Sequence, residues 1–159
     1  MIRALLAICA VLMLLPAGAA AQGSSDLWAT VNVCDTVAAP NTIGIRGSMP
    51  GLKRRATLRM RFRVQYLAPD GRWLAIRRNA DSKWQTVGRR RGGRVESGWS
   101  FTFAPPKAGG ENVLRGVVYF QWRQFGKVVR RARRITESGH TSTVGADPPG
   151  FSAGTCRIS

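Results

Sequence analysis

The chain has 159 residues, of which 44% are apolar, so it is long enough for one domain with a real core and short for two. Its formal net charge of +17 comes from 25 basic and eight acidic residues, which excludes an ordinary near-neutral surface. Such an excess of charge repels itself, and it is easier to accommodate where salt or anionic partners screen it.

The first 21 residues have the pattern of a secretory signal peptide. Arg3 precedes an apolar run over residues 4–15, and three alanines, Ala19 to Ala21, form a small-residue cleavage site. We expect cleavage after Ala21, which leaves a single domain over residues 22–159. The apolar run is shorter than the roughly 20 residues that span a bilayer. We therefore expect no membrane span after cleavage and a protein that is secreted, either extracellular or associated with the cell wall.

Two cysteines remain once the predicted leader and its Cys9 are removed. Cys34 and Cys156 lie near opposite ends of the mature chain. An even number of cysteines in an oxidising compartment indicates one disulfide bond. We expect the tail over residues 137–159, which is rich in Ser, Thr, Gly and Pro, to run back across the domain so that Cys156 meets Cys34.

Short β-strands are predicted through the first part of the domain, over residues 28–33, 42–46, 57–67, 73–77 and 83–87. The clearest is 57–67, where apolar residues alternate with Arg59, Arg61, Arg63 and Gln65 at the two-residue period of a strand. Residues 49–51 and 69–71 carry turn residues. Residues 88–94, GRRRGGR, indicate a flexible basic connection.

The second part of the domain predicts a strand over residues 98–104 and a β-hairpin over 113–136. In the strand, Trp99, Phe101 and Phe103 fall on one face. In the hairpin, the turn is expected at residues 124–127. The first arm places Leu114, Val118, Phe120 and Trp122 on one face and Arg115, Tyr119, Gln121 and Arg123 on the other. The second arm carries Arg130, Arg131, Arg133 and Arg134.

About seven short strands separated by turn residues indicate an all-β protein, and the alternation within them is typical of antiparallel sheets with one wet face. We expect an antiparallel β-sandwich, and a small barrel is the alternative.

The leader, the VCDT segment beginning at Val33, the basic middle and the ending ESGHTSTVGADPPGFSAGTC together resemble uncharacterised small secreted proteins of actinobacteria. The resemblance implies an immunoglobulin-like β-sandwich. Cys34 and Cys156 do not have the spacing of the usual inter-sheet disulfide of immunoglobulin domains, so the likeness concerns the architecture only.

No residue pattern in the chain indicates catalysis. His140 is the single histidine, and it stands in the polar tail without a motif that pairs it with a nucleophile. One histidine and two bonded cysteines cannot form a zinc site. The phosphate-binding glycine motifs of nucleotide enzymes do not occur either. We expect no enzyme activity, no metal and no cofactor, and nothing indicates a small-molecule substrate.

The arginines of the middle strands are the one constellation that indicates a function. Residues 53–134 hold 22 basic and four acidic residues, a local charge of +18, whereas the flanks 22–52 and 135–159 each carry −1. Guanidinium groups suit phosphate oxygens. We predict an anion-binding surface formed by Arg59, Arg61, Arg63, Arg130, Arg131, Arg133 and Arg134, with Tyr119 and Gln121 beside them.

The partner expected for that surface is an anionic polymer or surface of the cell envelope. Two alternatives remain open. The arginines can be a merely solvated face whose charge discourages edge pairing. The protein can also bind another protein through an apolar patch or a sheet edge, in which case binding would be insensitive to salt.

Overall fold

A computed structural model of the protein describes residues 26–107 and 109–159. The predicted leader, residues 1–21, lies outside the described residues. Within them, no helix has the length and hydropathy that a membrane crossing requires.

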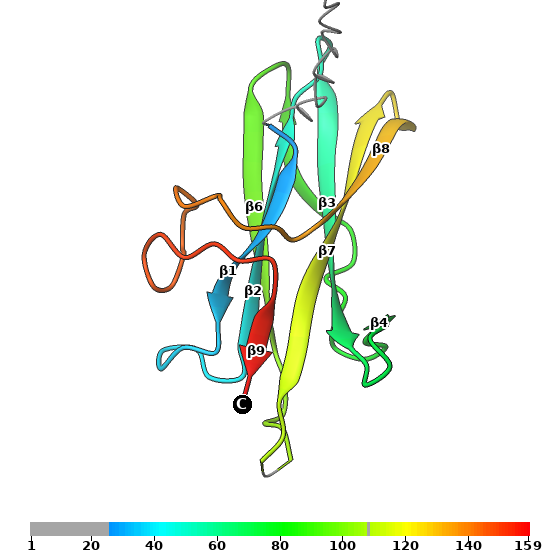
Figure 1. Ribbon diagram of the computed structural model, residues 1–159. Helices are drawn as coiled ribbons and strands as arrows, with labels where there is room; N and C mark the ends of the chain where they lie inside the picture. The colour runs from blue at the N-terminus through cyan, green and yellow to red at the C-terminus, as the bar shows by residue number, and fades with distance from the viewer. Residues whose placement is uncertain (1–25, 108) are drawn as a thin grey trace, which may run out of the picture.

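The described residues form nine β-strands in two antiparallel sheets that face one another (Figure 1). The smaller sheet has the order β1-β2-β6, with β1 Trp28–Cys34, β2 Thr42–Pro50 and β6 Arg94–Thr102. The larger sheet has the order β4-β3-β7-β8, with β5 paired to β3 and β9 to β7. Its strands are β3 Ala56–Leu67, β4 Trp73–Ala75, β5 Gln85–Arg90, β7 Asn112–Gln124, β8 Lys127–Ile135 and β9 Cys156–Ile158. The predicted antiparallel β-sandwich is confirmed, and in the described part of the chain no ladder closes the two sheets into a barrel.

The core lies between the sheets and follows the alternation that the sequence displays. The inward residues of β3 are fully buried, and they meet equally buried residues from β7 and β2. These core residues include Leu58, Met60, Phe62, Val64, Val118, Phe120, Trp122, Ile43, Ile45 and Met49. Because the apolar side chains of β3 all point inward, its arginines must point away from the core.

Two predicted connections are in fact parts of strands. The turn expected at residues 49–51 is wrong, because β2 continues to Pro50 and Met49 is fully buried. Pro50 is tolerated because it is the last residue of its strand. The flexible connection expected over 88–94 is also wrong. Residues 88–90 complete β5 and Arg94 begins β6, so the turn between them is confined to 91–93.

The strand predicted at 98–104 exists, and its aromatic residues share one face as expected, but they are not all buried. Phe101 is buried, but Trp99 is 42% exposed although it stands on the same face. The reason is that β6 is the edge strand of the smaller sheet, so the larger sheet does not cover its full length.

The hairpin predicted at the end of the middle region is confirmed as β7 and β8. Phe125 and Gly126 connect the two strands and have φ values of 47° and 75°. Positive φ at both central residues defines the type I′ turn, whose twist matches that of the paired strands.

The tail after β8 crosses the outer face of the smaller sheet. The ring of His140 stacks on Trp28 with ring centroids 4.3 Å apart. The hydroxyl groups of Thr30 and Ser152 lie 2.8 Å apart, and the Asn32 side chain donates a hydrogen bond of 2.8 Å to the carbonyl of Gly145. The tail therefore covers the β1 side of this face, whereas no tail segment lies over the outer face of the larger sheet in the described residues.

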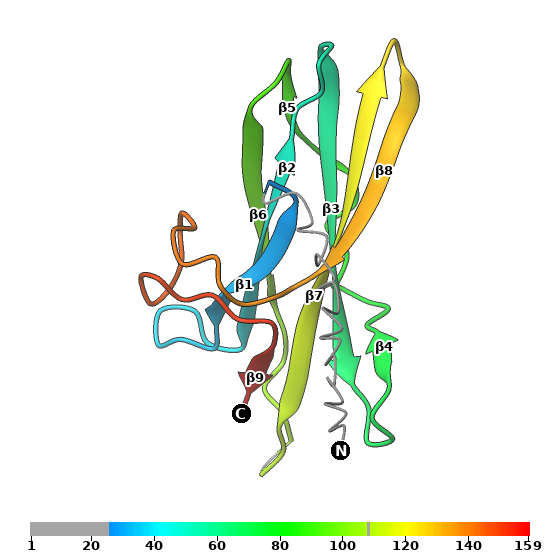
Figure 2. The ribbon, with the colours of Figure 1, turned by 45° about the horizontal axis from the view of Figure 1, so that its top comes forward.

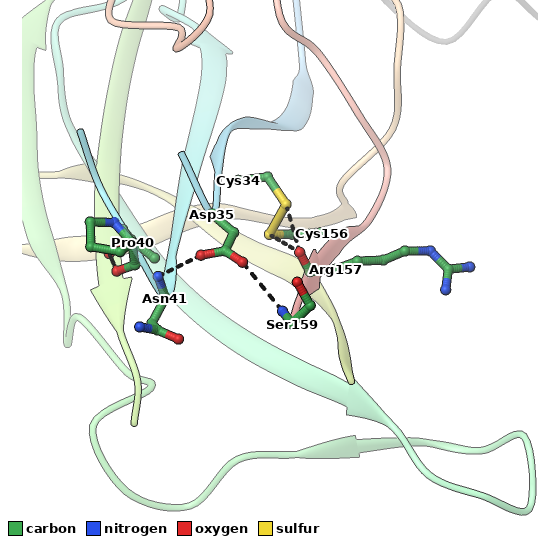
Figure 3. Close-up of a disulfide and its surroundings, with 8 residues drawn as sticks. Cys34, Asp35, Pro40, Asn41, Cys156, Arg157 and Ser159 are labelled. Atoms are coloured by element: carbon green, nitrogen blue, oxygen red, sulfur yellow. Dashed lines mark hydrogen bonds between the residues drawn. A yellow bond between two sulfur atoms is a disulfide. The ribbon is translucent and has the colours of Figure 1, made fainter. Parts of the chain in front are cut away.

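The predicted disulfide bond is present between Cys34 at the end of β1 and Cys156 at the start of β9 (Figure 3). Beside it, the carboxylate of Asp35 accepts hydrogen bonds from the backbone N–H groups of Asn41, at 2.6 Å, and Ser159, at 3.3 Å. Segments 122 residues apart are thus joined covalently and by hydrogen bonds at one end of the sandwich.

Candidate anion-binding surface

The outer face of the larger sheet collects arginines from four strands. In antiparallel ladders, residues directly opposite each other point to the same side. Arg59 lies opposite Gln121, which lies opposite Arg131, and Arg61 lies opposite Tyr119, which lies opposite Arg133. The register extends this set, which we call the basic face, to Arg59, Arg61, Arg63, Arg89, Arg115, Arg123, Arg131 and Arg133.

Five of the seven arginines predicted as a site lie on the basic face, and two do not. Arg130 lies opposite Trp122 and points to the core side of the sheet, where its guanidinium carbon is 4.7 Å from the centre of the Trp122 ring. Arg134 donates a hydrogen bond of 3.1 Å from its Nε to the carbonyl of Leu27. Neighbouring residues of a strand point to opposite faces, so adjacent arginines cannot all share one surface.

Asp81 neutralises part of the basic face. The Nε of Arg61 donates to its Oδ1 at 2.8 Å, the Arg61 Nη2 bonds its Oδ2, and the Nε of Arg63 lies 3.8 Å from Oδ2. The hydrogen bond from Arg61, aided by the backbone N–H of Lys83 and opposed by burial, lowers the pKa of Asp81 to about 2. The same hydrogen bond raises the pKa of Arg61. Arg61 and Arg63 therefore help to stabilise the fold, in addition to any part that they have in binding a ligand.

Aromatic rings and one amide are interleaved with the arginines. The guanidinium of Arg115 lies 4.2 Å from the centre of the Trp73 ring, and that of Arg59 lies 5.8 Å from Trp84. Burial, reinforced by repulsion from Arg133, lowers the pKa of Arg115. Gln121 is only 7% exposed between its neighbours, so it does not offer the hydrogen bonds to a ligand that its position suggested.

A cleft of about 710 Å³ opens at the end of the basic face nearest the β7–β8 turn. Its lining includes five arginines, Arg54, Arg55, Arg59, Arg89 and Arg123, together with residues of the turn. None of these five takes part in an ion pair between described residues. The cleft thus has cationic walls that no carboxylate of the described chain neutralises.

Two guanidinium groups of the cleft are held by backbone carbonyls. The Arg59 Nη2 donates to the carbonyl of Trp84 at 3.2 Å, and the Arg123 Nη2 donates to the carbonyl of Gly126. The Nε atoms of Arg59 and Arg123 are shielded from solvent and have no hydrogen-bond partner among the described residues. These arginines are positioned by the fold while their charge remains available to an anion.

Of the five arginines of the cleft, only Arg59 was among the site residues predicted from the sequence. Arg54 and Arg55 come from the β2–β3 loop, Arg89 from β5 and Arg123 from β7, which are far apart in the chain. They converge because β5, β3 and β7 are neighbours, and Thr57 of β3 lies opposite both Arg89 and Arg123. The run Lys53-Arg54-Arg55 before β3 was the sequence feature that could have indicated the cleft. Its place beside Arg89 and Arg123 follows from the strand order, which the sequence does not display.

The described residues offer few groups for metal binding or catalysis. They contain no cluster of three or more His, Cys, Asp or Glu side chains that could hold a metal ion. His140 lies in the tail, where its Nε2 is 3.2 Å from a carboxylate oxygen of Glu137 and its ring is stacked on Trp28. The arrangement suits the binding of anions by fixed guanidinium groups.

Comparisons with protein-family models, with curated proteins and with solved structures find no match for this chain. The resemblance to secreted actinobacterial proteins therefore stays a prediction. The fold and the cleft define an all-β sandwich with one disulfide bond and one strongly cationic face.

Proposed function

We propose that this protein is a secreted, non-catalytic module that binds anionic polymers of the cell envelope through the basic face and its cleft. The observation that carries the proposal is the set of five arginines in the cleft that no carboxylate of the described residues pairs with. Arginine forks bind phosphate and carboxylate oxygens with two hydrogen bonds each. A polymer supplies several such anions at once.

Secretion is the second part of the proposal. The leader pattern of residues 1–21 supports it, and so does the disulfide bond, because such bonds persist mainly in oxidising compartments. A protein in that location meets anionic wall polymers before any cytosolic partner.

The geometry favours a polymer over a single small anion. Successive arginines of β3 stand about 6.7 Å apart, which is twice the rise of a strand, and the cleft continues their row. A chain of regularly spaced anions can contact the cleft and the rest of the basic face together.

The experiment is a titration with long-chain inorganic polyphosphate over a range of salt concentrations. The cleft variant carries Arg59→Gln, Arg89→Gln and Arg123→Gln, and the matched control carries Arg72→Gln, Arg77→Gln and Arg78→Gln in the loops that flank β4. Both variants lose three charges. We expect the cleft variant to bind about tenfold or more weakly and to show a shallower salt dependence, by about one unit of slope for each lost contact. We expect the control to change little.

Equal losses in the two variants would mean that binding reports net charge alone, and the cleft would then not be the site. Binding to envelope material that persists at high salt in both variants would favour the protein-interaction alternative instead. A specific feature for that alternative is Trp99, which is 42% exposed beside a hollow of about 310 Å³ on the smaller sheet.

A further inference from the structure

Phe125 is a large apolar side chain that the fold presents to solvent at the apex of the β7–β8 turn. It is 96% exposed, and its φ is 47°. Type I′ turns strongly favour Asn, Asp or Gly at such positions, since a residue with a Cβ atom is strained there. A backbone strain that serves no packing is an indication of function.

The turn that carries Phe125 is braced from both sides. The Arg123 Nη2 donates to the carbonyl of Gly126 across the turn, and the Gln124 side chain donates a hydrogen bond of 3.3 Å to the carbonyl of Arg54 in the β2–β3 loop. The turn is therefore held in a defined place relative to the arginines of the cleft, and Phe125 lies at the rim of that cleft.

Three connections end together at this end of the molecule: the β2–β3 loop, the β5–β6 turn and the β7–β8 turn (Figure 2). They and the strand residues beside them form what we call the basic tip. Its basic residues are Lys53, Arg54, Arg55, Arg89, Arg90, Arg91, Arg94, Arg123 and Lys127. The one acid in these segments is Glu96, which pairs with Arg94 at 3.2 Å.

The opposite end of the sandwich has a different character. Acids and bases are paired there: Asp70 pairs with Arg72 at 2.7 Å, Glu111 pairs with Arg157 at 2.8 Å, and Asp35 lies in the β1–β2 loop beside Ser159. The molecule is therefore polarised along its length, with an excess of positive charge at the basic tip. An anionic surface would orient it with that tip forward.

We propose that the protein docks end-on to anionic phospholipid bilayers, with the basic tip on the lipid phosphates and Phe125 in the interfacial layer. A bilayer offers a plane of phosphates above an apolar layer, which matches a ring of cations around a projecting aromatic side chain. Amphipathic surfaces bind anionic membranes by this combination of charge and buried apolar area. A soluble polyanion would use the same arginines but gain nothing from a ring that stands in water.

This inference goes beyond the proposed function, because its distinguishing residue, Phe125, carries no charge. The informative variant is Phe125→Asn, since Asn removes the ring and suits the type I′ turn. The turn is then expected to be at least as stable as in the parent, so a loss of binding cannot be ascribed to unfolding. The matched control is Val37→Asn, because Val37 is fully exposed in the β1–β2 loop at the opposite end.

The test measures co-sedimentation of the folded protein with vesicles of phosphatidylcholine alone and of phosphatidylcholine mixed with phosphatidylglycerol. Binding to soluble polyphosphate is measured in parallel. We expect binding to the mixed vesicles only. Phe125→Asn should weaken binding to the mixed vesicles about tenfold, because one aromatic side chain is no longer buried in the bilayer, and should weaken polyphosphate binding much less, because the arginines of the cleft remain in place. Val37→Asn should alter neither.

Insertion is tested directly with Phe125→Trp and vesicles whose acyl chains carry bromine, which quenches nearby tryptophan. We expect stronger quenching than in the parent. The proposal is overturned if the parent ignores phosphatidylglycerol, if Phe125→Asn binds vesicles as tightly as the parent, or if it loses polyphosphate and vesicle binding equally. Vesicle binding as described without any polyphosphate binding would refute the proposed polymer function and leave this inference standing.

Discussion

The substitution Asp81→Asn is expected to weaken the fold and strengthen polyanion binding at once. Asn has nearly the volume of Asp and keeps an oxygen to accept the hydrogen bond of 2.9 Å from the backbone N–H of Lys83. It removes the negative charge that Arg61 and Arg63 share. The variant therefore isolates the effect of the charge from the effect of the shape.

The size of the stability effect follows from the pKa of Asp81, which the fold lowers from 3.8 to about 2. Each pKa unit corresponds to about 1.4 kcal/mol, so the charged form stabilises the fold by about 2 kcal/mol at neutral pH. For a domain of this size, that loss lowers the melting temperature by about 6–10 °C. Because the pKa is lowered on folding, this stabilisation is complete above pH about 4 and disappears as the pH falls towards 2.

Urea unfolding measured near pH 7 and near pH 2 tests this prediction. At neutral pH the variant should unfold at lower urea, and near pH 2 the two proteins should differ much less. Titration with polyphosphate should also show tighter binding by the variant, because Asp81 is the carboxylate that pairs with arginines of the basic face. A variant as stable as its parent at neutral pH would refute the reasoning about the pair, and unchanged affinity would refute its link to binding.

Two further predictions concern the fold. Replacing Cys34 and Cys156 together by Ser removes a covalent link between residues 122 apart in the sequence. The chain-entropy relation then gives a loss of about 5 kcal/mol in the free energy of unfolding and a drop in melting temperature of about 15–20 °C. A melting curve that coincides with the parent's would contradict this. Gly116→Ala should destabilise the protein by about 1–3 kcal/mol, because the new Cβ atom would lie 2.6 Å from Cγ2 of Thr136 and 2.8 Å from Cδ1 of Ile45. Equal urea midpoints for variant and parent would show that the neighbours of Gly116 accommodate the added Cβ atom without loss of stability.

The sequence predicted those parts of the molecule in which a local pattern decides the structure. β3 is the clearest example, since Leu58, Met60, Phe62 and Val64 are all buried as their alternation required. The disulfide bond was equally accessible, because only two cysteines remained to form it. The turn wrongly expected at residues 49–51 rested on Pro50, and a proline that ends a strand has the same local appearance as one that begins a turn.

The candidate site was harder to predict because it depends on register and strand order. A bulge between Trp122 and Arg123 sets Arg130 opposite Trp122, and this choice of phase sends Arg130 to the core side and Arg131 to the basic face. The sequence of β8 is compatible with either set of alternate residues facing outward. The cleft requires in addition that β5, β3 and β7 be neighbours, which no local pattern displays.

If the protein binds polyanions as proposed, the tail that crosses the smaller sheet limits how many polymer chains one molecule can hold. Proteins with cationic groups on two opposite faces can link separate polyanions into networks, which then precipitate or separate as droplets. Here the tail covers the β1 side of the smaller sheet through the contacts of His140, Ser152 and Gly145, and the arginines of the basic face all lie on the larger sheet. A protein of this kind should be monovalent: it should coat a polyanion as separate molecules and leave the polymer dispersed.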